Sequence, residues 1–84
     1  MDIEKIVEKN CKYRKQNNAS GIHDRAYEAA LRRVHEMYKD INSIERLKLY
    51  QMMAREAYRL EGSTHLNTAK CIILMEMINE LENS

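Results

Sequence analysis

Apolar residues recur along this chain at steps of three and four, which is the period of an amphipathic α-helix. The pattern predicts four helices, over about residues 2–16, 22–40, 43–61 and 64–81. One apolar stripe marks the first helix, and it consists of Ile3, Ile6, Val7 and Cys11. The second helix has a seam suited to packing against another helix, made of Tyr27, Leu31, Val34, Tyr38 and Ile41. No stretch alternates cleanly as a β-strand would, so we expect an all-α protein.

Residues that favour turns or helix caps separate the predicted helices. The run from Asn17 to Gly21 collects residues that compete with helix formation, and it predicts the main break, a loop within one domain. Asn42 or Ser43 can cap the third helix, because short polar side chains accept a hydrogen bond from the first turn. Glu45 follows Asn42 at the spacing of a capping box.

The third and fourth predicted helices also meet at a short polar link. Gly62 is placed for a left-handed C-terminal cap, and Ser63 or Thr64 can cap the last helix. A short link implies that the helices 22–40 and 43–61 are antiparallel neighbours. We therefore expect a small bundle of four helices that forms a single domain over residues 1–84. The alternative is a three-helix core with the first helix packed across it.

The third helix carries more apolar positions than one neighbour would cover. Its stripe consists of Ile44, Leu47, Leu49, Tyr50, Met53, Ala54, Ala57 and Leu60. This width predicts that the helix 43–61 is central in the bundle. The last helix contains the unbroken apolar run 71–75, whose middle must be covered on most sides.

Composition agrees with a small helical protein and leaves self-association open. The chain has 84 residues, no proline and two glycines. A chain of this length buries only about two thirds of its unfolded surface, so its stability should be modest. No window reaches the roughly 18 apolar residues of a membrane span, and the N-terminus lacks the apolar run of a secretory signal. We expect a cytoplasmic protein that does not contact a membrane.

No arrangement of residues predicts catalysis, a cofactor or a metal site. Cys11 and Cys71 match no metal-ligand or disulfide spacing, so we interpret both as buried thiols. The histidines, at positions 23, 35 and 65, are not spaced to aim two ligands at one ion. The sequence has no nucleophile elbow and no phosphate-binding glycine loop. We therefore expect a protein that is not an enzyme.

Protein binding is the function that the sequence favours. The three later helices carry more apolar residues than one small core can hide. The residues expected to face outward and contact a partner are Tyr50, Met52, Tyr58, Ile72 and Met75. Tyr and Met are enriched at the cores of protein interfaces, and Met adapts to irregular partners. The opposite interpretation is that these residues cover one another within the core.

Nucleic-acid binding is the alternative, because charge is unevenly distributed along the chain. The net charge is +1, but residues 1–39 carry +3 and residues 40–84 carry −2. No acidic residue lies between Glu8 and Asp24, which makes this segment locally basic. The candidate contacts are Lys9, Lys12, Tyr13, Arg14, Lys15, Arg32 and Arg33, with Tyr13 as a stacking surface. The near-neutral overall balance counts against this function.

The sequence therefore predicts a small helical regulator that binds another protein or a second copy of itself. Its small size and its Lys-, Asn- and Ile-rich composition are typical of inhibitors encoded by phages or other compact genomes.

Overall fold

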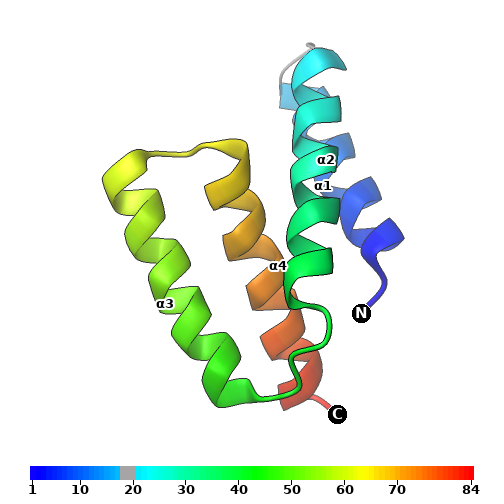
Figure 1. Ribbon diagram of the computed structural model, residues 1–84. Helices are drawn as coiled ribbons and strands as arrows, with labels where there is room; N and C mark the ends of the chain where they lie inside the picture. The colour runs from blue at the N-terminus through cyan, green and yellow to red at the C-terminus, as the bar shows by residue number, and fades with distance from the viewer. Residues whose placement is uncertain (18–20) are drawn as a thin grey trace.

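The fold is built from helices joined by short links. The computed structural model describes the backbone of residues 1–17 and 21–84 and the side chains of residues 1–11 and 25–84. Its helices are α1 (Ile3–Asn17), α2 (Gly21–Tyr38), α3 (Ile44–Glu61) and α4 (His65–Glu82) (Figure 1). The predicted all-α fold, a bundle of four helices, is confirmed. Within the predicted break 17–21, residues 18–20 lie outside the described residues.

Helix α3 begins at a serine cap. Ser43 has extended backbone, and its hydroxyl accepts a hydrogen bond from the backbone N–H of Arg46 at 3.3 Å. Because Ser43 and not Asn42 is the cap, Glu45 occupies the second helical position, one short of the capping-box position. The predicted capping box of Asn42 and Glu45 is therefore wrong, whereas the predicted Ser43 cap is confirmed.

The link between α3 and α4 is tightly fixed. Gly62 closes α3 with φ 91° and ψ −173°, and its N–H donates to the carbonyl of Tyr58 at 2.8 Å. Thr64 caps α4 by accepting from the N–H of Asn67 at 3.0 Å. The side chain of Asn67 is buried, and its amide donates to the carbonyls of Gly62 at 3.2 Å and Ala57 at 3.4 Å. The Gly62 N–H thereby satisfies one of the carbonyls that the C-terminus of α3 leaves without a helical partner, and the Asn67 amide ties α4 to the same turn.

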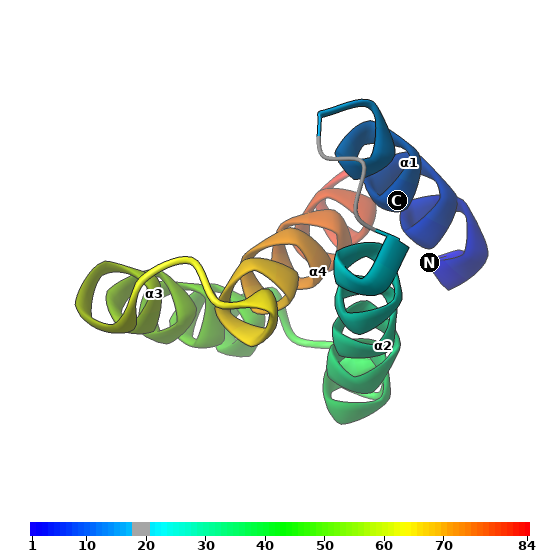
Figure 2. The ribbon, with the colours of Figure 1, turned by 90° about the horizontal axis from the view of Figure 1, so that it is seen from above.

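Helix α4, not α3, is the central helix. It packs against α3 on one side and against α2 on the other, as Figure 2 shows from above. Six α4 residues are buried: Asn67, Ala69, Ile73, Leu74, Met77 and Ile78. Helix α3 buries only Leu47 and Ala54. The prediction that the helix 43–61 is central is wrong, because its wide apolar stripe is divided between an inner and an outer side.

Helices α2 and α3 are not packed neighbours, in contrast to the prediction. Helix α4 lies between them (Figure 1), and the two backbones do not approach each other along the described residues. The link 39–43 can extend about 17 Å, which is enough to pass a helix of roughly 10–12 Å diameter. Near this link the rings of Tyr38 and Tyr50 meet, with centroids 5.3 Å apart.

Helix α1 packs along α2, and ion pairs support this contact. Arg32 of α2 donates to both carboxylate oxygens of Glu4, at 2.7 and 3.0 Å. The amino group of Met1 reaches α4 and pairs with Glu80 at 2.7 Å. Apolar contacts join α1 to the same core, through Ile6 and Val7.

Among the described residues, no helix is both long and apolar enough to cross a membrane.

Candidate functional site

The most distinctive surface of the molecule is the side of α3 that points away from α4. Four large apolar side chains lie there with most of their area exposed: Leu49 (57%), Met52 (67%), Met53 (59%) and Leu60 (70%). Their spacing of three, four and seven residues places them on one helix face. We call these four residues the outward face of α3. Figures 1 and 2 show α3 at the edge of the molecule, with α4 on only one of its sides.

The opposite side of α3 holds the helix in place. Leu47 and Ala54 are buried in the core, roughly 150° around the helix from the outward face at 3.6 residues per turn. Tyr50 is half-buried and packs against this core and the ring of Tyr38. Burial of the Tyr38 hydroxyl, with a smaller contribution from Tyr50, raises the pKa of Tyr38 above its usual value. The outward face is therefore displayed on an anchored helix.

Charged residues border the outward face. Glu56 lies between Met53 and Leu60 and forms an ion pair with Arg59. Lys48 reaches across to α4, where it pairs with Glu82 at 3.3 Å. Glu45, in the first turn of α3, is exposed. The site thus consists of apolar side chains with Glu56 among them and further charged residues at its margins.

The five residues predicted to contact a partner occupy different environments. Met52 belongs to the outward face of α3. Tyr58 and Met75 are each 42% exposed. Tyr50 and Ile72 are half-buried and pack against the core, so they do not face outward as predicted. Tyr50 contacts Tyr38 of α2 and Ile72 packs against the core, which the helical period alone does not reveal.

Three residues of the outward face were missed as binding candidates. Leu49, Met53 and Leu60 belong to the wide stripe of the helix 43–61, which the sequence assigns to the core. The width of this stripe could have identified them, because a single neighbouring helix cannot cover so many apolar positions. The structure gives α3 one packed neighbour along its length, α4, and the remainder of the stripe is exposed.

The basic residues predicted for nucleic-acid binding are only partly described. Lys9 and Arg33 are exposed. The guanidinium of Arg32 is held by Glu4 and by Glu28, whose carboxylate lies 3.3 Å from Nε. The side chains of the remaining candidates lie outside the described residues: Lys12, Tyr13, Arg14 and Lys15. Within the described part of the chain, the basic surface is therefore weakened by pairing at Arg32.

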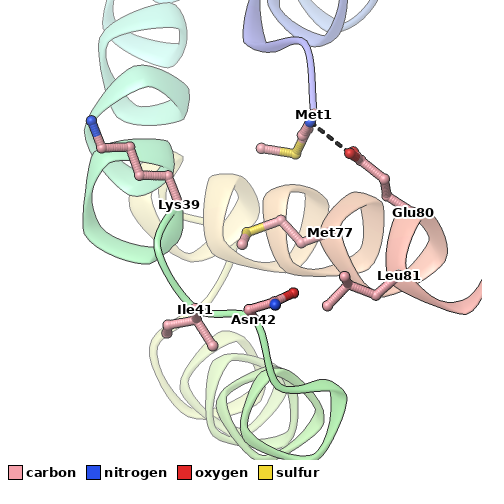
Figure 3. A pocket seen from close by; sticks show the side chains of 7 residues that line it. All are labelled: Met1, Lys39, Ile41, Asn42, Met77, Glu80 and Leu81. Carbon is pink, nitrogen blue, oxygen red and sulfur yellow. Dashed lines mark hydrogen bonds and ion pairs between the residues drawn. The ribbon is translucent and has the colours of Figure 1, made fainter. Parts of the chain in front are cut away.

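A small pocket lies where the N-terminus, the α2–α3 link and α4 meet. Its volume is about 230 Å³, and its lining consists of Met1, Lys39, Ile41, Asn42, Met77, Glu80 and Leu81. Figure 3 shows the Met1 amine joined to Glu80 on one side, with the link residues on the other. This volume is below the roughly 300–1,000 Å³ of typical ligand sites. Its charged groups already pair within the chain, so we place the candidate site on α3.

The cysteines and histidines form no cluster in the described part of the chain. Cys11 is buried and Cys71 is half-buried, so the prediction of two buried thiols is right for Cys11 and only partly right for Cys71. Burial raises the pKa of the Cys71 thiol, which disfavours the reactive thiolate. Among the described residues, no group of three or more histidine, cysteine or acidic residues is arranged to hold a metal ion.

Comparison with known proteins gives no match to a family model, to a curated protein or to a solved structure.

Proposed function

We propose that this chain is a protein-binding module that recognises its partner through the outward face of α3. The observation that carries the proposal is the exposure of Leu49, Met52, Met53 and Leu60 together on one helix face. Exposed apolar residues scattered singly are ordinary on protein surfaces, whereas a contiguous group with a polar rim is typical of interaction sites.

Burial of this face would supply the free energy of binding. Each square ångström of apolar surface removed from water contributes about 25 cal/mol to the free energy of association. In most interfaces a few large side chains supply the greater part of the binding energy. Met52 and Met53 add adaptable, polarisable side chains. Leu47 and Ala54 anchor the inner side of α3, so little ordering of the helix is needed when the partner binds.

Site-specific photo-crosslinking in cells of the source organism tests this function. A benzoylphenylalanine residue replaces Met52 in one variant and Met37 of α2, which is 52% exposed, in a matched control. We expect a covalent protein adduct at the first position and little or none at the second. Equal adducts at both positions, or none at either, would show that the outward face of α3 is not a binding surface. Mass spectrometry of the adduct identifies the partner.

Binding of nucleic acid through Lys9, Arg33 and the basic residues of α1 is the second candidate. It is less well supported, because Arg32 is already paired with Glu4 and Glu28. This function demands an affinity that falls steeply with salt, since phosphate contacts release counterions.

A further inference from the structure

The chain exposes more surface than a compact monomer of its size. Its accessible surface is 5859 Å², whereas a monomer of 10.0 kDa exposes about 5,200 Å². The difference of about 650 Å² shows that the bundle is less compact than an average monomer of this mass. The outward face of α3 accounts for the most exposed apolar part of this surface. A second helix laid along α3 would cover it.

The charges beside the outward face are complementary to those of a second α3 that runs in the opposite direction. Glu45 and Arg59 lie 14 residues apart, about four helical turns, so they border the face on the same flank. Met52 lies midway between them. A two-fold axis beside Met52 would place Glu45 opposite the partner's Arg59, so that Arg59 would contact Glu45 of the other copy in addition to Glu56 of its own chain.

A parallel arrangement would not bring these charges together. Around a two-fold axis parallel to the helices, the flank that carries Glu45 and Arg59 lies on opposite sides of the contact in the two copies, so these two residues do not meet. Antiparallel pairing also aligns the helix dipoles favourably. Because α3 packs against α4 on one side only, a second helix can approach from the other side without displacing an element of the bundle.

We propose that the partner is a second copy of this chain, which binds α3 against α3 in antiparallel fashion around a two-fold axis near Met52. This inference rests on the proposed function of the outward face and names its occupant. Each contact occurs twice in such a dimer, because a two-fold interface is formed by the same surface on both subunits.

Light scattering coupled to size exclusion, over a range of protein concentrations, tests the dimer. We expect a mass that approaches twice 10.0 kDa as the concentration rises.

The variants Glu45→Arg and Arg59→Glu should each weaken the dimer by about tenfold, since each creates two like-charged pairs. The double variant Glu45→Arg/Arg59→Glu should form a tighter dimer than either single variant, because both pairs are restored with reversed sign. Arg33→Glu, on α2, is the matched control and should have no effect.

Each other outcome overturns the inference in a distinct way. A mass of 10.0 kDa at every concentration shows that the protein is a monomer and excludes a second copy of the chain as the partner. If a photo-reactive residue at position 52 nevertheless captures a different protein, the proposed function stands and only this inference fails. If the protein is dimeric but the double variant is as weak as either single variant, the antiparallel arrangement is wrong. Circular dichroism of each variant establishes that its monomer is folded.

Discussion

Gly62 has a backbone conformation that few other residues can adopt. Its φ of 91° and ψ of −173° fall in a region that is essentially restricted to glycine. A Cβ at this position would meet no atom within 4 Å, so the restriction comes from the backbone alone. The conformation turns the chain from α3 into α4 and thereby fixes the direction of the helix that displays the outward face.

Gly62→Ala should therefore destabilise the protein by about 1–3 kcal/mol, through backbone strain and without a steric clash. The measurement is the free energy of unfolding in urea, monitored by far-UV circular dichroism. Ser63→Ala, at the neighbouring exposed position, is the control and should change the stability by less than about 0.5 kcal/mol. Equal stability of Gly62→Ala and the wild type would show that the turn is not strained for other residues.

At the scale of single elements, the sequence predicts the helices well and their faces less well. The helical period and the caps at Ser43, Gly62 and Thr64 locate each helix closely. The period cannot tell how many neighbours a helix has. The stripe of 43–61 is consistent with a central helix and equally with an edge helix that has two apolar sides. The interpretation as a central helix assigns Leu49, Met53 and Leu60 to the core, whereas the structure exposes all three.

Ionisation of Glu4 adds to the contact between α1 and α2. Arg32, through its hydrogen bonds and its charge, holds the pKa of this carboxyl below its usual value of 4.5. A carboxyl whose pKa is lowered on folding stabilises the folded state above the unfolded value, and it loses this contribution as the pH falls through the folded value. The pair is exposed, so its effect is small and salt-dependent.

Glu4→Gln should remove this pH dependence. The difference in unfolding free energy between the wild type and the variant should be constant above about pH 4.5 and should shrink below it. Urea unfolding at a series of pH values measures this difference, and Glu8→Gln on the same helix serves as the control. A difference that does not change with pH would mean that Glu4 and Arg32 are not coupled in solution.

At the scale of the whole molecule, the arrangement follows from which helix has apolar residues on most of its circumference. Helix α4 does, and it therefore takes the position between α2 and α3; its buried and half-buried apolar residues include Ala69, Cys71, Ile72, Ile73, Leu74, Met77 and Ile78. In the sequence, the apolar run 71–75 indicates that the last helix is covered on most sides. The wider apolar stripe of 43–61, however, favours that helix as the central one. The candidate site follows from the same arrangement, because a helix at the edge leaves one apolar side uncovered. Of the predicted contact residues, Met52 lies on that side.

Crosslinking through a cysteine at position 52 tests the central claim, that the outward face of α3 meets the same face of a second chain. With a short bismaleimide, Met52→Cys should form a covalent dimer of twice 10.0 kDa, because the two residues lie near the two-fold axis. The wild type controls for Cys11 and Cys71, and Met37→Cys controls for random collision. Covalent dimer formation by Met52→Cys that does not exceed these two controls would contradict the claim.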